Sequence, residues 1–276
     1  MALFAANDLE LHVFDMKTAY RNAPMDVNVY VQQPEGYEED PTGMVARLLY
    51  ALYGRKQAGR LCGNHCRGTL TAIGAVCSMA DPTMYVWQHP VHGPIFILVH
   101  VDDMAVTAKT LAGVSVAKEV VLSAYEGRDL GASNTFLGMR DDRDRAAGTL
   151  KLSCRGVTAA LLEQFGMGGA RPNKLPMAFK KNLMRTGVHL LEDSTRYSEF
   201  MGSLLYLSTT TRPDISYAAG VLARSMNNPE EQHWMAAKGV LRYLSGTADY
   251  GLCYGPAEEL AGAVDADLGG CSETRR

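Results

Sequence analysis

Apolar and polar residues alternate along two short segments near the start of the chain. Residues 9–15 alternate as far as Phe14 and end on Asp15, and residues 27–31 alternate again. A period of two is typical of a half-buried strand, because successive side chains point to opposite faces. We therefore predict two strands here, the first of which presents the Asp15 carboxylate at its end. A loop rich in proline and acidic residues follows the second strand.

The most informative segment consists of two apolar runs joined by two acidic residues. Residues 94–101 are apolar with the single exception of His100. The acidic pair Asp102 and Asp103 comes next, and residues 104–107 continue the apolar pattern. This order predicts two strands with an acidic turn between them. Further strands are predicted at residues 136–139 and 149–153, around a loop rich in Asp and Arg.

Helical spacing of apolar residues appears in four stretches. Residues 45–70 favour a helix that four glycines weaken, and a second helix is predicted at 114–124. Apolar faces at 197–205 and 234–244 predict two more, with Gly246 ending the last one. Residues 172–193 are rich in Pro, Lys and Gly and indicate a boundary between these parts.

Length and composition place the chain among globular proteins. Its 276 residues can form one large or two ordinary domains, and 47% are hydrophobic and 21% charged. No apolar run reaches the roughly 20 residues of a membrane-spanning helix, and the start lacks the order of a signal peptide. We expect a soluble, intracellular protein that is not secreted, with its six cysteines as free thiols.

The charge of the chain leaves its partner open. A net charge of -3 argues mildly against nucleic-acid binding, because neutralising phosphates requires clustered Lys and Arg. Such clusters nevertheless occur within residues 47–67 and 171–185. Overall charge therefore neither predicts nor excludes a nucleic acid.

Asp102 and Asp103 are candidates for metal binding. Adjacent carboxylates repel each other, and a divalent cation that prefers oxygen ligands is the usual compensation. With Asp15 they could hold two ions about 4 Å apart for phosphoryl transfer. A solvated hairpin turn is the alternative, and the acidic pair taken alone favours that alternative.

The segment Cys62-Gly-Asn-His65-Cys66 combines residue types that bind zinc. A structural zinc site needs four ligands, usually from two paired clusters, and no second cluster lies nearby in the sequence. We therefore do not predict zinc.

Motifs in a fixed order run through nearly the whole chain. They are Leu11-His-Val-Phe-Asp15, Val29-Tyr-Val-Gln-Gln-Pro34, Leu52-Tyr-Gly-Arg-Lys-Gln57, His100-Val-Asp-Asp103, Phe136-Leu-Gly138, Gly202-Ser-Leu-Leu-Tyr-Leu207, Thr211-Arg-Pro-Asp-Ile215, His233 and Leu241-Arg-Tyr-Leu-Ser-Gly-Thr247. This series resembles the copia-type reverse transcriptases of LTR retrotransposons, which are part of the pol polyprotein. The resemblance implies an α+β fold, in which a polymerase palm with an antiparallel sheet and partial fingers precedes a mostly helical thumb or connection region.

The resemblance also implies four parts. Residues 1–140 would be the reverse transcriptase palm with partial fingers, lacking the N-terminal fingers, and 141–190 a thumb-like segment and linker. Residues 191–257 would be the connection region, and 258–276 the truncated start of a ribonuclease H domain. In that last part Asp265 would match the first catalytic carboxylate, and we expect no ribonuclease activity from this chain.

The resemblance further assigns roles to single residues. The catalytic ligands of Mg²⁺ (or Mn²⁺) would be Asp15, Asp102 and Asp103. The implied partners are an RNA template, a DNA or RNA primer duplex and deoxynucleoside triphosphates, with no membrane. The implied location is a cytoplasmic particle or the nucleus.

Three further residues would contact the incoming nucleotide. Tyr20 would exclude a ribose 2′-hydroxyl by steric contact, and Gln57 and Lys56 would bind the nucleotide. Without the resemblance, Tyr20 would be interpreted as an ordinary packing residue and Gln57 as an amide on a helix surface.

Three positions depart from the family's motifs. His100 stands in place of Tyr, Arg55 in place of Leu, and Cys62 in place of a Trp. The last change replaces a large aromatic side chain and should cost about 2–4 kcal/mol of stability if that position is in the core. The resemblance implies the RNA-directed DNA polymerase portion of the polyprotein, which performs two-metal nucleotidyl transfer. The three departures and the expected lack of fingers predict that this chain on its own performs the reaction weakly or not at all. The alternatives are a degenerate remnant that only binds nucleic acid or a protein partner, and a fragment without a stable fold.

Overall fold

The computed structural model describes residues 2–37, 43–132, 134–177, 183 and 187–255. The chain divides into two compact units, the first made mainly of residues 7–136 and the second mainly of residues from 137 onward. Each unit has a hydrophobic core of its own. In the described residues, no helix has the length and apolar character needed to cross a membrane.

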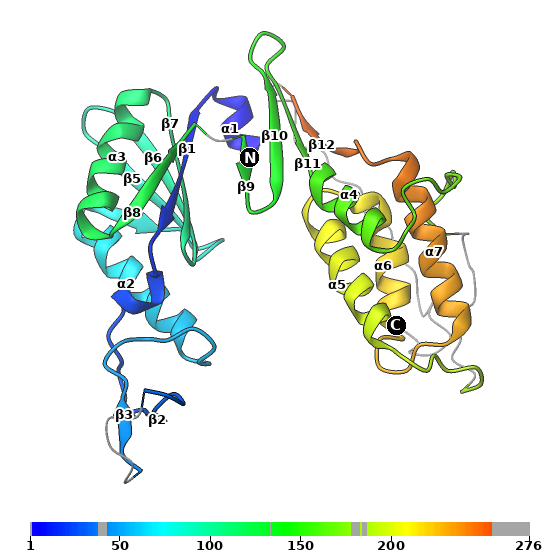
Figure 1. Cartoon of the computed structure of the whole chain (residues 1–276). Helices are drawn as coiled ribbons and strands as arrows, with labels where there is room; N and C mark the ends of the chain where they lie inside the picture. The colour runs from blue at the N-terminus through cyan, green and yellow to red at the C-terminus, as the bar shows by residue number, and fades with distance from the viewer. Residues whose placement is uncertain (1, 38–42, 133, 178–182, 184–186, 256–276) are drawn as a thin grey trace. The chain divides into compact units, whose positions relative to one another are not determined.

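An antiparallel sheet of six strands forms the first unit (Figure 1). The two apolar runs predicted around an acidic turn are confirmed as strands of this sheet, and so is the alternating segment that ends near Asp15. In spatial order the strands are β4 (Ala75–Cys77), β5 (Met84–His89), β6 (Gly93–His100), β7 (Asp103–Ala108), β1 (Glu10–Met16) and β8 (Gly127–Gly131).

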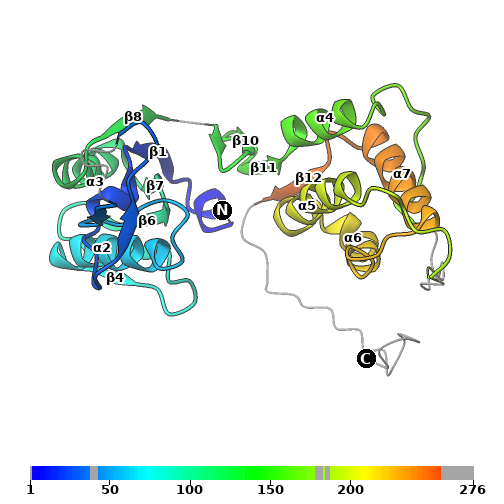
Figure 2. The same cartoon turned by 60° about the horizontal axis from the view of Figure 1, so that its bottom comes forward.

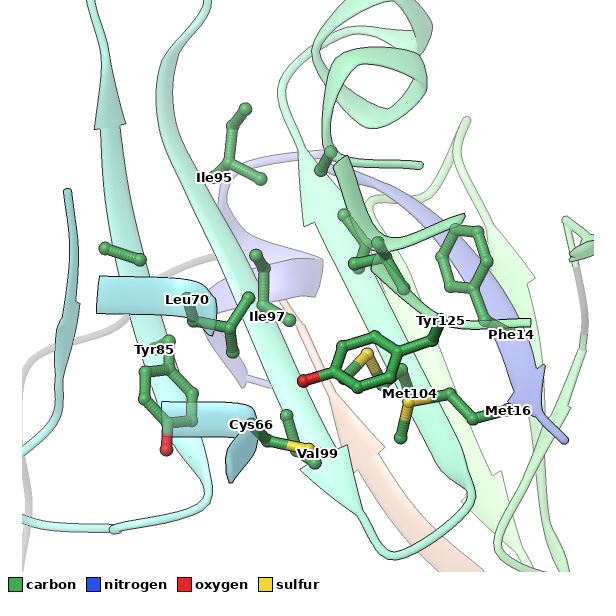
Figure 3. Close-up of a cluster of buried hydrophobic side chains, with 14 of the residues drawn as sticks. Phe14, Met16, Cys66, Leu70, Tyr85, Ile95, Ile97, Val99, Met104 and Tyr125 are labelled. Atoms are coloured by element: carbon green, nitrogen blue, oxygen red, sulfur yellow. The ribbon is translucent and has the colours of Figure 1, made fainter. Parts of the chain in front are cut away.

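One face of this sheet carries the core of the first unit. Helices α2 (Ala58–Ala72) and α3 (Leu111–Ala124) cover that face, and the predicted helix at 114–124 is confirmed within α3. Figure 3 shows Phe14, Met16 and Met104 pointing into one cluster with Ile97. A slip of β1 by one residue would turn its buried side chains to the other face, so this burial fixes the register.

The segment before α2 differs from the prediction. The predicted helix at 45–70 is wrong at its start, because β3 (Val45–Arg47) pairs there with β2 (Tyr30–Gln32). The chain then turns through Gly54, whose φ of 83° ordinary side chains rarely adopt, and helix begins only at Ala58. The remaining short elements are α1 (Ala2–Ala6), η1 (Ala19–Asn22) and β9 (Thr135–Phe136).

The second unit combines strands with helices that pack side by side (Figure 2). The predicted strand at 149–153 and the two predicted helices are confirmed, and the last helix ends at Gly246 as predicted. The elements are β10 (Met139–Asp144), β11 (Thr149–Ser153), α4 (Arg155–Gln164), α5 (Thr195–Thr210), η2 (Pro213–Ile215), α6 (Ser216–Ala223), α7 (Glu231–Gly246) and β12 (Gly251–Tyr254). Together they confirm a mixed α and β architecture with antiparallel sheets.

Two predictions around β10 are wrong. The predicted strand at 136–139 is broken, since Leu137 and Gly138 have φ values of 50° and 74° and turn the chain. The predicted loop rich in Asp and Arg is strand β10, which pairs with β11. This strand can carry charged residues because every second position is exposed to solvent and none is fully buried. On the exposed face Arg140 and Asp142 form an ion pair at 2.7 Å.

A buried arginine inside the second unit forms an ion pair at η2 and also hydrogen-bonds to the end of α7. Arg212, only 1% exposed, donates to both oxygens of Asp214 at 3.0 and 2.8 Å, and also to the carbonyl of Thr247. Burial raises the pKa of Asp214, but the donors Arg212 and Tyr243 outweigh it, so the pKa lies below its usual value. The stabilisation is therefore present above the usual Asp pKa and is lost as the pH falls through the lowered one.

The two partners of this pair should differ in their effect on stability. Removing the acid in Asp214→Ala leaves a buried guanidinium without its counter-charge and should lower the free energy of unfolding by about 3–5 kcal/mol. Removing the base in Arg212→Met leaves a carboxylate that is 31% exposed and hydrated, and should cost about 1–2 kcal/mol.

Urea unfolding, followed by the fluorescence of Trp234 in a Trp87→Phe background, measures this unit separately. Asp249→Asn is the control, because its ion pair with Arg155 is exposed on both sides and should change the unfolding free energy by less than about 0.5 kcal/mol. A larger loss in Arg212→Met than in Asp214→Ala would contradict the assignment.

Candidate active site

A strained two-residue turn joins β6 to β7. His100 pairs with Asp103, so Val101 and Asp102 form the turn between them. Val101 has a φ of 55°, which a tight hairpin requires at this position but which a β-branched residue adopts only at a cost of about 1–3 kcal/mol. The core that fixes both strands holds the turn in this conformation and places Asp102 and Asp103 at the sheet edge.

The Asp102 carboxylate is held by donors from two other segments. Its Oδ1 accepts from the backbone N–H of Ala19 at 2.7 Å, and the Tyr53 hydroxyl lies 2.6 Å from Oδ1 and 2.7 Å from Oδ2. Thr18, with a φ of 51°, turns the chain after β1 and so directs the Ala19 N–H toward Asp102. Burial and the neighbouring Asp102 charge raise the pKa of Tyr53 to about 12, so its hydroxyl stays protonated and donates.

Asp15 and Asp103 lie directly opposite each other in the β1–β7 pair. Opposed residues of an antiparallel pair share one face, with Cβ atoms roughly 5 Å apart. Burial and then the charge of Asp15 raise the pKa of Asp103, and Asp102 adds to this while His100 partly opposes it. The geometry therefore concentrates negative charge that a cation would relieve.

Asp15 and Asp102 both line a cavity of about 550 Å³ at this edge. Its wall also carries Arg128, whose guanidinium lies 3.7 Å from Asp15. Gly127 permits the close approach of β8, because a Cβ there would lie 2.6 Å from the Asp15 carbonyl oxygen. The cavity thus contains two of the three predicted carboxylates and positive charge beside them.

Tyr20 belongs to a second, neighbouring cavity. This cavity of about 330 Å³ is also lined by His100, Val101 and Cys62, and the Tyr20 ring lies 4.3 Å from the ring of Tyr53. The structure therefore brings Tyr20 next to the acidic turn.

The other predicted contact residues lie elsewhere. Gln57 immediately precedes α2 and Lys56 lies exposed in the preceding turn, and neither lines these two cavities. Asp265 lies outside the described residues.

Chemically the three carboxylates suit a hard divalent cation, but their arrangement here does not. The described residues contain no group of three His, Cys, Asp or Glu side chains placed to hold a metal ion. In addition, Tyr53 and the backbone N–H of Ala19 donate hydrogen bonds to the oxygens of Asp102. The carboxylates are close neighbours that do not form a ready coordination site.

Cys62 and Cys66 are free thiols on one side of α2. A hydrogen bond from Cys62 lowers the pKa of the Cys66 thiol despite its burial. The five cysteines of the described ranges are free as predicted, and Cys271 lies outside them.

Sequence reasoning gave no role to Tyr53 or Arg128, although both lie against the predicted carboxylates. Tyr53 stands within the motif Leu52–Gln57, yet its bond to Asp102 spans 49 residues. A lone Tyr or Arg carries no signal of such a contact. Only the fold reveals it.

Comparison with known proteins shows the family to which the chain is related. A family profile described as "Reverse transcriptase (RNA-dependent DNA polymerase)" matches residues 1–179. The chain is 34% identical to the retrovirus-related Pol polyprotein from transposon TNT 1-94 of Nicotiana tabacum, over 100% of the chain and 21% of that protein. It is 34% identical to the Pol polyprotein from transposon RE2 of Arabidopsis thaliana, over 93% of the chain and 18% of that protein.

A shorter relative matches over most of its own length. The chain is 33% identical to a putative transposon Ty5-1 protein of Saccharomyces cerevisiae, over 92% of the chain and 82% of that protein. The two Pol polyproteins, by contrast, are matched over only about a fifth of their length.

The repulsion between Asp15 and Asp103 predicts a pH-dependent gain in stability. Because the pKa of Asp103 is raised in the folded state, its charge opposes folding above that pKa and the cost disappears as the pH falls to the usual value. Asp103→Asn should therefore raise the free energy of unfolding at neutral pH by about 0.2–1 kcal/mol, and the gain should vanish on acidification.

Urea unfolding between about pH 4 and pH 8, read from Trp87 in a Trp234→Phe background, measures this. The control is Asp81→Ala, where hydrogen bonds from Thr83 lower the Asp pKa, so that removing the acid should cost stability at neutral pH. A stability loss in Asp103→Asn at neutral pH would show that the charge is not opposed by Asp15.

Proposed function

The chain belongs to the family of reverse transcriptases (RNA-dependent DNA polymerases), and we propose that its first unit is the catalytic palm of such an enzyme. The observation that carries this proposal is the register that sets Asp15 opposite Asp103 and beside the turn at Asp102. The reaction would be template-directed nucleotidyl transfer by the reverse transcriptase portion of a retrotransposon polyprotein.

The proposal assigns parts of the fold to parts of a polymerase. Residues 1–140 would be the palm with partial fingers, for which the β2–β3 hairpin is the candidate, and 141–190 a thumb-like segment and linker. Residues 191–257, which contain α5 to α7, would be the connection region. The start of a ribonuclease H domain would fall in residues 258–276, outside the described residues.

The cofactor would be Mg²⁺ (or Mn²⁺) at Asp15, Asp102 and Asp103. When bound, it would supply the positive charge that the repulsion between Asp15 and Asp103 requires. The arrangement in which Tyr53 holds Asp102 does not fit the ion, which supports weak activity of this chain on its own.

The substrates would bind at the two cavities beside the acidic turn. Tyr20, which lines the smaller cavity, would contact the sugar of the incoming deoxynucleoside triphosphate, and Gln57 and Lys56 would assist from the turn before α2. Arg60 and Arg67 also line the smaller cavity and would attract a phosphate backbone of the RNA template or primer duplex. A cytoplasmic particle or the nucleus would supply such partners.

Primer extension on an RNA template tests the proposed function. We expect slow, Mg²⁺-dependent extension that falls by about 100-fold or more in Asp102→Asn, because the reaction depends on charge at that carboxylate. Asp142→Asn is the matched control, since it removes an acid from an exposed ion pair of the second unit and should leave extension unchanged.

Three outcomes would contradict parts of this proposal. Extension that survives Asp102→Asn would place the chemistry elsewhere, and fast extension by the unmodified chain would overturn the expected weakness. Salt-dependent binding of the template–primer duplex with no extension at all would favour the binding-only remnant.

A further inference from the structure

We propose that the Tyr53 hydroxyl competes with a divalent cation for the Asp102 carboxylate, so that Tyr53 must leave before the ion can bind. This inference rests on the proposed function, because it takes Asp102 to be a cation ligand. It concerns a residue for which the sequence predicted no role.

The contact distances show the conflict. The Tyr53 oxygen lies 2.6 and 2.7 Å from the two Asp102 oxygens, and the Ala19 N–H also donates to Oδ1 at 2.7 Å. A hydroxyl placed between both oxygens fills the direction from which a cation would approach that carboxylate. Because one position contacts both oxygens, the hydroxyl and a cation that binds Asp102 through both oxygens cannot share it.

The hydroxyl also performs part of the ion's electrostatic role. An O–H donor presents partial positive charge to an anion that lies near the carboxylate of Asp103. Tyr53 therefore stabilises the ion-free protein. The cation binds Asp102 only by replacing this donor. The apparent affinity for the cation therefore equals the intrinsic affinity multiplied by the fraction of molecules in which Tyr53 has already left.

The position of Tyr53 allows it to leave without unfolding its surroundings. Tyr53 is 46% exposed and stands in a turn next to Gly54. The segment is anchored on both sides, because Ala51 donates to the Ala23 carbonyl at 2.9 Å and α2 begins at Ala58. A rotation of the side chain would move the hydroxyl to water, which replaces its hydrogen bond while the phenol keeps its proton.

Mn²⁺ binding to the full chain, followed by the electron paramagnetic resonance of the free ion, tests this competition. Tyr53→Phe keeps the ring that packs on Tyr20 and removes only the hydroxyl, so its Kd for Mn²⁺ should fall by about 5- to 20-fold. Tyr50→Phe is the matched control, a 53% exposed tyrosine three residues earlier, and its Kd should equal that of the unmodified chain.

Asp102→Asn separates the competition from the site itself. Loss of Mn²⁺ binding in Asp102→Asn together with tighter binding in Tyr53→Phe supports the inference. An unchanged or higher Kd in Tyr53→Phe, with binding still lost in Asp102→Asn, overturns the role of Tyr53 and leaves the carboxylate site standing. Binding that is insensitive to both substitutions overturns the inference and the proposed metal site together.

Discussion

The pairing of β1 with β7 runs from Glu10 opposite Ala108 to Asp15 opposite Asp103, and the position of each acidic side chain follows from this register. Burial of Phe14, Met16 and Met104 beneath α2 and α3 fixes it, since a shift by one residue would expose these side chains. The apolar face of the sheet thus holds two carboxylates together on the opposite face, where they repel. The packing of the core stabilises the fold enough to keep these two carboxylates close together despite their repulsion.

Strain at the site has the same origin. Val101 and Thr18 both adopt left-handed conformations that are uncommon for their residue types, one in the β6–β7 turn and one just after β1. Together they bring the Ala19 N–H and the Asp102 carboxylate into contact. Tyr53 completes this arrangement, because its hydroxyl lies against both oxygens of the same carboxylate.

The sequence predicted well what depends on local patterns. β6 and β7 are continuous apolar runs, and the helix ending at Gly246 has regular spacing, so both were recognisable. Strand β10 was missed because its residues are charged and its pairing with β11 decides its conformation. The ordered motifs identified the family, which the comparisons confirm, but the contact of Tyr53 with Asp102 joins distant segments that no pattern links.

The central claim is that the strand register places the charge of Asp15 against Asp103. Labelling the aspartates with ¹³C and following the carboxyl resonance of Asp103 through a pH titration tests it directly. In the unmodified chain the pKa of Asp103 should lie above the usual Asp value, and in Asp15→Asn it should move back toward that value. An Asp103 pKa that is the same in both proteins would contradict the account.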